Sequence, residues 1–262
     1  MPFHDRGFTI FSRLLLGTLL LTCATGLQWL EEDYLVSSFE KIALRSEYRP
    51  GEAKPLRKWL KPVRIYIDSR LGSEHIQSQL VDEHLATLRL LIAHPVERVP
   101  LRELANMVIL FERSDRLRQA MGDYYTEAPF SGELLEKSIC VAQINVKASG
   151  EIVQAFIAIP PDKARARGKL PACVVEEITQ GLGLPNDSDE VYPSVFNDRS
   201  VDERLSPLDK LLLQALYDPR LKPGMSAGQV LPIVRRIVRE RLPEMREKYK
   251  VLLERDERYW LE

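Results

Sequence analysis

The sequence has few histidines and cysteines, and its positive and negative charges almost cancel. Its 262 residues include three cysteines and four histidines, the last of them His94. Three cysteines cannot hold together a fold of this size, so the core must come from apolar packing, which 45% hydrophobic residues can supply. The 37 basic and 38 acidic residues give a net charge of -1, which excludes a global electrostatic attraction to nucleic acid.

Several functional motifs are also missing. The sequence contains no glycine-rich phosphate loop, no dinucleotide-binding fingerprint and no C-x-x-C pair. Three of the histidines, His75, His84 and His94, fall on or just after one predicted helix, but they are not spaced four residues apart. We therefore expect them at the surface or at helix ends rather than as metal ligands.

Residues 1–27 have the pattern of an export signal. Arg6 and Arg13 precede an apolar run over 14–21, and residues with small side chains follow it over 22–26. Basic residues, a short apolar run and small residues in this order are typical of a secretory signal peptide. Because Arg13 keeps the N-terminus inside, we predict that the rest of the chain is exported to the periplasm or cell envelope.

Three fates of this N-terminal segment remain open. Cleavage after Gly26 is compatible with the residues around it. The string over 20–23 resembles a lipoprotein box in which Cys23 carries the lipid, with Thr22 in place of the usual Gly, Ala or Ser. The uncharged stretch 14–30 is near the lower limit of about 17 residues for an uncleaved membrane anchor. We expect a membrane tether formed by the lipid or by the anchor.

Two regions follow this segment. Residues 28–62 are basic and interrupted by prolines, which favours a solvated, partly helical linker; a membrane-proximal patch facing anionic headgroups is the alternative. Residues 63–262 interleave strand-like and helix-like patterns and predict one three-layer α/β domain. The predicted strands are 63–68, 106–112, 139–146 and 152–159; the predicted helices are 73–93, 115–125, 171–182, 206–217 and a long C-terminal amphipathic helix.

Polar side chains recur at helical spacing in the second half of the sequence. On a helix Glu176 and Gln180 share a face, whereas Glu177 projects about 100° away from Glu176. Gly183 allows the helix to stop in a left-handed conformation, and the turn after it can return Asn186 to the same face. The oxygen-bearing side chains of Glu176, Gln180 and Asn186 are therefore expected to converge.

This layout resembles the metzincin clan of zinc metallopeptidases, whose motif is H-E-x-x-H-x-x-G-x-x-H. Residues 176–187 read E-E-x-x-Q-x-x-G-x-x-N-D, with L-G-L-P over 182–185. Residues 192–197 resemble the segment around the clan's Met-turn, and 205–217 resemble the helix after it. The resemblance covers roughly 173–217 and implies a zincin-like domain with a mixed sheet, a motif helix and a helical C-terminal part. The same run resembles an uncharacterised family of exported bacterial proteins.

The residues at the metzincin ligand positions differ from those of the active enzymes. Glu176, Gln180 and Asn186 stand where the clan has zinc-binding histidines, and Glu177 keeps the position of the general-base glutamate. Neutral amides are poor zinc ligands, and without zinc the peptidase lacks its activated water. We therefore expect a pseudo-metallopeptidase without a cofactor; zinc or another divalent cation is the less favoured option.

Two interpretations of the polar residues stay open. They can form a hydrogen-bonded network that holds the motif helix against the following loop. Alternatively, Asp187, Asp189 and Glu190 can add oxygens to a hard-cation or polar-ligand site. At the Met-turn equivalent, Ser194-Val195-Phe196, we expect Phe196 to fill the place of the methionine in the core.

The remaining cysteines are candidates for a disulfide. Cys140 falls on a predicted strand, and Cys173 lies at the start of the motif helix. In an exported protein these two cysteines can pair, closing a loop of about 30 residues; two separate buried thiols are the alternative.

These features predict an exported, membrane-tethered protein without zinc peptidase chemistry. The resemblance implies a cleft that holds an extended peptide against a strand edge, so the favoured function is binding of a peptide or an envelope protein. One alternative is an active hydrolase with an atypical metal site, in which Glu176 is a ligand and Glu177 the general base. The other is a purely structural envelope protein.

Overall fold

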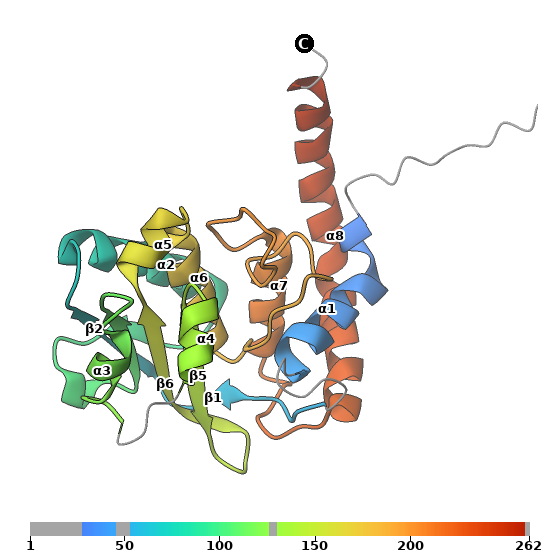
Figure 1. Ribbon diagram of the computed structural model, residues 1–262. Coiled ribbons are helices and arrows are strands. Elements are labelled where there is room, and N and C mark those ends of the chain that lie inside the picture. The colour runs from blue at the N-terminus through green and yellow to red at the C-terminus, as the bar shows by residue number, and fades with distance from the viewer. Residues whose placement is uncertain (1–27, 46–52, 126–129, 260–262) are drawn as a thin grey trace, which may run out of the picture.

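The computed structural model describes residues 28–45, 53–125 and 130–259, which form a mixed α/β domain (Figure 1). Its centre is a six-stranded sheet in the order β3–β2–β4–β6–β5, with β1 pairing to the beginning of β6. β5 runs antiparallel to β6, whereas β1, β2, β3, β4 and β6 pair in parallel. The strands are β1 (Lys58–Trp59), β2 (Val63–Ser69), β3 (Val96–Arg98), β4 (Met107–Phe111), β5 (Val141–Val146) and β6 (Glu151–Ile159).

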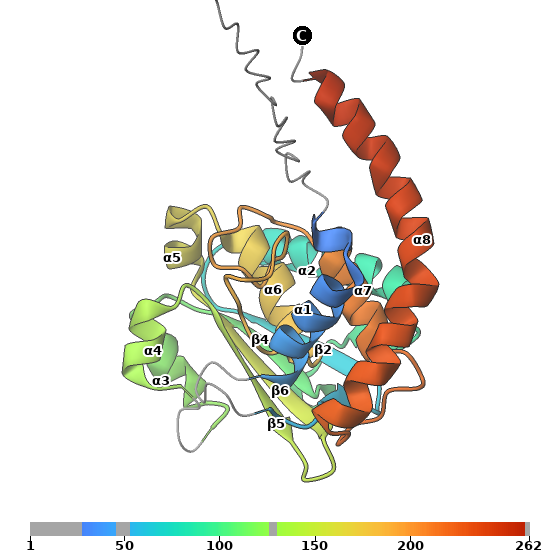
Figure 2. The same cartoon turned by 90° about the vertical axis from the view of Figure 1, so that its right-hand side faces the viewer.

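Helices cover both faces of the sheet, which confirms the predicted three-layer α/β architecture. One core contains α2 and α6, and a smaller core on the opposite face contains α3 and the partly buried side chains of α4 (Figure 2). The α-helices are α1 (Glu32–Leu44), α2 (Glu74–Leu91), α3 (Leu117–Met121), α4 (Gly132–Lys137), α5 (Pro161–Ala166), α6 (Leu170–Gly181), α7 (Pro207–Leu216) and α8 (Ala227–Tyr259); the short 3-10 turns are η1 (Gln28–Leu30) and η2 (Arg102–Leu104).

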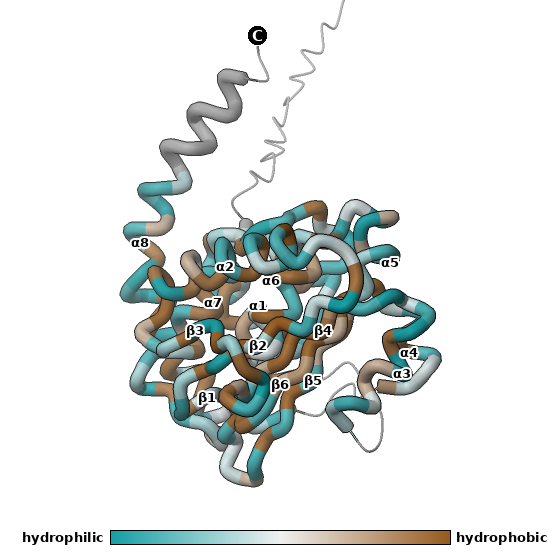
Figure 3. The backbone as a smooth tube through the Cα atoms, turned by 90° about the vertical axis from the view of Figure 1, so that its left-hand side faces the viewer, coloured by the Kyte–Doolittle hydropathy of each residue, from teal (hydrophilic) through white to brown (hydrophobic). Residues whose placement is uncertain are grey.

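The central strands are buried on both faces, and their side chains alternate between the two cores. On β4, Met107, Ile109 and Phe111 contribute to the core with α2 and α6, whereas Val108 and Leu110 contribute to the core with α3. This alternation is the period of two that a strand imposes, and a strand covered on both faces reads as a continuous apolar run. Figure 3 shows the hydrophobic segments gathered in the sheet.

The helices α1, α7 and α8 form a second group beside α2 and α6. α7 begins with a capping box: Asp209 N donates to Ser206 Oγ at 3.1 Å, and Ser206 N donates to the Asp209 carboxylate at 2.8 Å. α8 buries Val234, Ile237 and Val238, and its C-terminal part projects beyond the domain (Figures 1 and 2).

The segment 28–62 is not the solvated linker that we expected. Its residues Leu35, Phe39 and Ile42 are fully buried on one face of α1, which packs against α7 and α8. Farther along, Trp59 on β1 is buried and its ring nitrogen donates to the Gly181 carbonyl at 2.9 Å. The segment therefore completes the core of the domain, because the apolar face of α1 has neighbours to pack on.

Two basic residues of this segment are also not fully solvated: Lys58 is buried and Arg57 is half-buried. Lys58 Nζ donates to the carbonyls of Asp218 and Leu221, both at 3.0 Å, and burial lowers the pKa of Lys58 to about 8. Arg57 donates to the Ala43 carbonyl at 3.3 Å. The run of charges predicted that both side chains would be exposed. They instead donate hydrogen bonds to main-chain carbonyls, at the end of α1 and in the segment after α7.

Most of the predicted long elements are confirmed, but the helix expected over 115–125 is shorter and extends only over Leu117–Met121. The strands β2, β4, β5 and β6 and the helices α2, α6 and α7 lie within about two residues of their expected limits. β1, β3, α4 and α5 are short elements that we did not predict. Gly150 has the positive φ of +82° that the expected turn between β5 and β6 requires.

The export segment 1–27, including Cys23, lies outside the described residues. Among the residues that are described, none of the helices combines the length and the apolarity that crossing a bilayer requires.

Candidate functional site

The motif helix α6 is held in the core by its apolar face. Val174, Ile178 and Leu182 are fully buried against the sheet and its neighbours, and the helix ends at Gly181, just before Gly183. Gly183 has a φ of +115°, and a Cβ at this position would lie 2.5 Å from the Arg57 carbonyl oxygen. The chain can therefore turn sharply here, and the residues after α6 return along the same helix.

Two glutamates of α6 and one aspartate after it meet at a pocket of about 420 Å³. Glu177 is 3% exposed, and Glu176 and Asp187 are half-buried. Glu176, Asp187 and Asp198 each offer one carboxylate oxygen, and these three oxygens lie within 4.8 Å of one another. We refer to these three residues as the pocket cluster.

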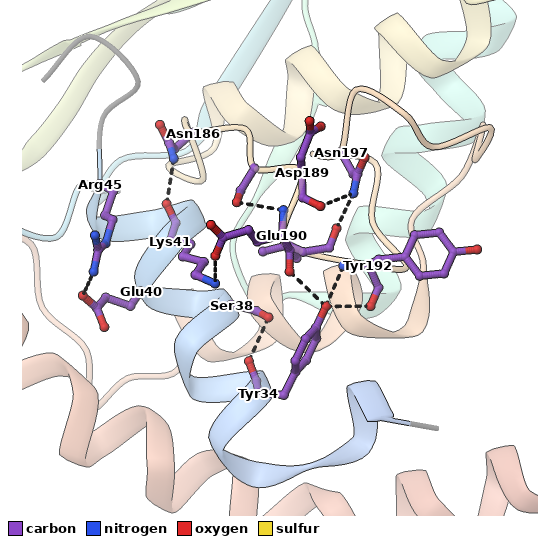
Figure 4. Close-up of polar contacts among 12 residues, drawn as sticks. Tyr34, Ser38, Glu40, Lys41, Arg45, Asn186, Asp189, Glu190, Tyr192 and Asn197 are labelled. Carbon is purple, nitrogen blue, oxygen red and sulfur yellow. Dashed lines mark hydrogen bonds and ion pairs between the residues drawn. The ribbon is translucent and has the colours of Figure 1, made fainter. Parts of the chain in front are cut away.

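The predicted convergence of three side chains holds only in part. Gln180 reaches the pocket cluster, because its Nε2 donates to Asp187 Oδ1 at 2.6 Å. Asn186 does not return its amide to this cluster: Nδ2 donates to the Lys41 carbonyl of α1 at 2.9 Å (Figure 4). Neither residue belongs to the described lining of the pocket, where Asp187 takes the place that we expected for Asn186.

Both charge signs line the pocket. Besides the pocket cluster, Glu177 and Asp202 contribute carboxylates, and Lys137, Arg167 and Lys169 contribute cations. The acidic side chains outnumber the basic ones in this lining. The pocket is therefore a polar cavity with a negative balance, suited to a ligand that offers hydrogen-bond donors or positive charge.

Lysine side chains hold two walls of the pocket. Lys163 Nζ donates to the Leu135 carbonyl at 3.1 Å and to the Ser138 carbonyl at 2.6 Å, which fixes the segment before β5. Lys169 Nζ donates to the Ser200 carbonyl and fixes the opposite wall. Sequence reasoning missed both lysines, because their acceptors are main-chain atoms of distant segments.

The predicted disulfide between Cys140 and Cys173 is present and forms part of the pocket wall. It joins the residue before β5 to the first half of α6. The segment that leads into the edge strand is therefore covalently attached to the motif helix. Because Cys140 is engaged in this bond, its sulfur is not a thiolate ligand for a metal beside Glu176 and Glu177.

The donor set of the site does not fit the zinc of a peptidase. The pocket cluster consists of carboxylates. Among the described residues, no histidine lines the pocket or belongs to a group of side chains that could hold a metal ion. Zinc sites in peptidases use imidazole, which anchors the ion and tunes its water. Carboxylates alone suit harder cations such as calcium or magnesium. No zinc-dependent step follows from these residues.

His84 is buried, contrary to the expectation of a surface position. It is 4% exposed, and its Nε2 lies 3.1 Å from Thr179 Oγ1 on the inner side of α6. The Thr179 hydroxyl donates to the Val175 carbonyl at 2.6 Å, so its oxygen accepts from His84 and the proton belongs on Nε2. Burial lowers the pKa of His84 to about 3, which keeps the ring neutral.

The Met-turn equivalent is a closed network around Asp209. Phe196 is fully buried and belongs to the main core, as we expected for the residue in the methionine position. Ser194 Oγ donates to Asp209 Oδ1 at 2.6 Å, and Val195 N donates to Asp209 Oδ2 at 3.1 Å. Burial raises the pKa of Asp209 to about 6, while the hydrogen bonds from Ser194, Val195 and Ser206 act in the opposite direction.

Asp209 was missed as the centre of this network, although a signal for it exists. The string S-P-L-D over 206–209 is a capping-box pattern, which predicts contact between its first and last residues. The additional bonds to Ser194 and Val195 have no counterpart in local sequence. They require the chain to fold back onto the start of α7.

A G-M-S-A-G string over 224–228 fits the G-x-S-x-G pattern, which sequence reasoning passed over. A nucleophile elbow needs a strand before the serine and a helix after it. Here α7 and a loop precede Ser226, whose main-chain nitrogen donates to Gln229 Oε1 at 2.9 Å. Ser226 therefore starts α8 and does not form an elbow.

One family model matches the chain. It is described as "Protein of unknown function (DUF2927)", and it matches residues 32–236, more than half of the chain. The matched range begins at α1 and includes the pocket, the edge strand and the Asp209 network. No curated protein matches the sequence significantly. By the extent of this match, the chain belongs to the DUF2927 family of proteins of unknown function.

Proposed function

We propose that this protein is an exported, membrane-tethered pseudo-metallopeptidase that binds an extended peptide segment, free or within an envelope protein. The observation that carries this proposal is the position of the pocket. It lies where the segment entering the edge strand β5 meets α6, and β5 pairs with β6 alone among the described strands. A strand edge beside a pocket offers main-chain pairing for affinity and a side-chain site for specificity.

Exposed apolar side chains on β5 and on the loops between α6 and α7 are available to a partner. Val146, at the end of β5, is 37% exposed, and Val201, between two pocket-lining residues, is 89% exposed. Tyr192 is 65% exposed, and its ring extends away from α1 (Figure 4). Of these, Val201 adjoins the pocket lining, and exposed apolar and aromatic side chains of this kind are often used in surfaces that bind another chain.

The chemistry of the pocket favours binding over peptide hydrolysis. Gln180 and Asn186 use their amide donors for bonds to Asp187 and Lys41, and no histidine lines the described pocket. Without a tightly held zinc ion, a peptidase of this kind has no activated water. Glu177 keeps the position of the general base, but the described lining of the pocket pairs it with no zinc-binding histidine.

The test uses the full chain in detergent micelles and a display library of random-sequence peptides. Enriched peptides are synthesised, their dissociation constants are measured, and their amides are N-methylated one at a time. Strand pairing predicts that methylation weakens binding at alternate positions, because successive amides point to opposite sides. A methylation profile without alternation, or a library without enriched peptides, would overturn the proposal.

A pair of charge reversals locates the site on the protein. Asp198→Lys changes an exposed residue of the pocket cluster, and Glu103→Lys changes an exposed residue of η2, which follows β3 at the opposite edge of the sheet. We expect Asp198→Lys to weaken peptide binding and Glu103→Lys to leave it unchanged. Equal effects of both changes would place the binding surface elsewhere, and a role as a purely structural envelope protein would then be favoured.

A second candidate, a hydrolase with an atypical metal site, is favoured by the close approach of the carboxylates in the pocket cluster. Three carboxylates can hold a hard divalent cation, and Glu177 would then act as general base. Elemental analysis of the chain, purified without a chelator or a histidine tag, tests this alternative. A stoichiometric metal that is lost in Glu176→Ala and kept in Glu103→Ala would favour the hydrolase.

The export and tethering part of the proposal rests on the sequence of residues 1–27. Membrane fractionation of the full chain and of the Cys23→Ala variant distinguishes a lipid anchor from an uncleaved anchor. A lipid anchor predicts that the variant leaves the membrane fraction, whereas an uncleaved anchor predicts that both chains stay there. Recovery of the unmodified chain in the cytoplasmic fraction would contradict export.

A further inference from the structure

The helix α1 directly follows the N-terminal segment and contacts the loop that forms one wall of the pocket. We define the site loop as residues 186–192, which include the pocket residue Asp187. Figure 4 shows α1 lying along this loop, with polar contacts at both of its ends. The contacts connect residues about 150 positions apart in the sequence, so they form only when the whole domain folds.

At the first end of the loop, Asn186 completes the C-terminus of α1. The last four carbonyls of a helix have no partner within the helix. Here Asn186 Nδ2 donates to the Lys41 carbonyl at 2.9 Å, and Asn186 N donates to the Ile42 carbonyl at 3.2 Å. The next two carbonyls accept from Arg57 at 3.3 Å and from Lys54 N at 2.7 Å.

This role accounts for an asparagine at position 186. The main-chain N–H of Asn186 satisfies one carbonyl, and its side-chain amide satisfies the neighbouring carbonyl at the same time. A histidine aimed at a metal in the pocket would leave the Lys41 carbonyl without its donor. The residue at the expected third ligand position is therefore used to join the site loop to α1.

At the other end of the loop, Tyr34 holds the main chain through its hydroxyl. Tyr192 N donates to Tyr34 Oη at 2.8 Å, and Tyr34 Oη donates to the Tyr192 carbonyl at 2.9 Å. Between these ends, Lys41 forms an ion pair with Glu190, whose side chain is 75% exposed. An exposed pair of this kind contributes little, so the main-chain bonds carry the attachment.

We propose that α1 is the positioning element of the peptide site, with Tyr34 and Asn186 as positioning residues that hold Asp187 at the pocket wall. This inference rests on the proposed function, and it deepens that function by connecting the site to the part of the chain that carries the membrane tether. Asp187 lies between the two attachment points, and Gln180 then orients its carboxylate.

The test compares Tyr34→Phe with the matched control Tyr249→Phe in the full chain. Both changes remove a phenol hydroxyl and keep the ring; Tyr249 lies on α8, where its ring contacts Trp29. Amide hydrogen exchange is measured for the site loop, α6 and α7, and affinity is measured for a library-selected peptide. We expect Tyr34→Phe to speed exchange at Tyr192 and to weaken peptide binding, each about tenfold, with α6 and α7 unchanged.

A second variant guards against simple unfolding. Asn186→Asp keeps the shape of the side chain but replaces its donor with an acceptor facing the carbonyls of α1. We expect faster exchange in the site loop and weaker peptide binding here as well. If either variant speeds exchange in the loop without weakening peptide binding, or leaves both unchanged, the positioning role is wrong.

A separate readout distinguishes failure of this inference from failure of the proposed function. The rate at which dithiothreitol reduces the Cys140–Cys173 bond reports on the pocket wall without any peptide. If the parent chain binds no peptide, the proposed function fails. The inference that α1 positions the pocket wall then survives only if Tyr34→Phe speeds both loop exchange and disulfide reduction, and Tyr249→Phe speeds neither.

Discussion

The fold uses the carboxylate of Asp209 and the three carboxylates of the pocket cluster in opposite ways. Asp209 is 0% exposed and accepts hydrogen bonds from Ser194, Val195 and Ser206. The pocket cluster instead borders a cavity of about 420 Å³ that is also lined by cationic side chains. The Asp209 network closes the fold, whereas the pocket cluster faces space that another molecule can occupy.

The difference shows what decides the role of a polar residue in this protein. Asp209 lies at the N-terminus of α7, where main-chain N–H groups point at its carboxylate. Glu176 lies in the middle of α6, where the main-chain groups of the helix are already bonded. Asp209, at the start of a helix, therefore accepts hydrogen bonds from the main chain. Glu176, in the middle of a helix, instead lines the pocket.

The largest effect is expected from Asp209→Ala. Its removal leaves the donors of Ser194, Val195 and Ser206 without their acceptor in a buried site, so we expect a loss of about 3–5 kcal/mol in the free energy of unfolding. Denaturant unfolding measures it. Asp198→Ala, the matched change in the pocket cluster, should stay within about 0.5 kcal/mol of the parent. Similar values for the two variants would remove the distinction between them.

Acid should destabilise the protein through His84. Its folded-state pKa is about 3, below the ordinary value of 6.5. Between these values the unfolded state binds a proton that the folded state does not, so stability is lost as the pH falls from 6.5 toward 3. The loss is on the order of 3 kcal/mol at pH 4.

Asp209 should act in the opposite direction. Its folded-state pKa of about 6 lies above the ordinary 3.8, so the folded state gains a proton first as the pH falls through 6. Unfolding curves of His84→Leu at pH 4 and pH 7 separate the two effects. We expect this variant to lose less stability on acidification than the parent; an equal loss would contradict a neutral buried His84.

The disulfide should contribute less than the Asp209 network. Cys140 and Cys173 are 33 residues apart, so their bond is expected to add about 3 kcal/mol by restricting the unfolded chain. The double variant Cys140→Ala, Cys173→Ala should unfold at lower denaturant concentration and become insensitive to dithiothreitol. If the variant is as stable as the parent but binds the selected peptide more weakly, the bond serves the pocket rather than the fold.

The smallest effects, on stability and on peptide binding alike, are expected at Glu177. Glu177→Gln keeps the size of the side chain, and binding of the selected peptide should change by less than about threefold. The peptide should remain intact with both the parent and the variant in mass spectrometry. Cleavage by the parent that is absent in Glu177→Gln would favour the hydrolase over the binding protein.

The strands and long helices could be predicted because their signals are local. β2 alternates, β4 is a continuous apolar run, and α7 starts with a capping box, so each carries its pattern within a few residues. The disulfide could be predicted because the pattern over 1–27 predicts export, which leaves Cys140 and Cys173 as candidates to pair. The position of Gly183 also predicted the end of α6, since positive φ favours glycine.

The rest of the site could not be predicted from local patterns. The sequence does not indicate that Asn186 turns to α1, because its partners are two carbonyls more than 140 residues away. His84 looks the same whether its helix face is exposed or packed on α6. Lys58, in a run of charges, has the composition of a linker but the neighbours of a core residue.

The sequence by itself determined the long strands and helices from residue 63 onward, the turn after α6, the disulfide pair and the absence of histidines that a zinc peptidase needs. These features depend on residue type and spacing, which are properties of short stretches. Only the tertiary structure decided that α1 belongs to the domain, that Asp187 rather than Asn186 lines the pocket, and that the pocket adjoins a strand edge. Each of these depends on which distant main-chain groups and apolar faces meet, and that is settled by packing of the whole domain.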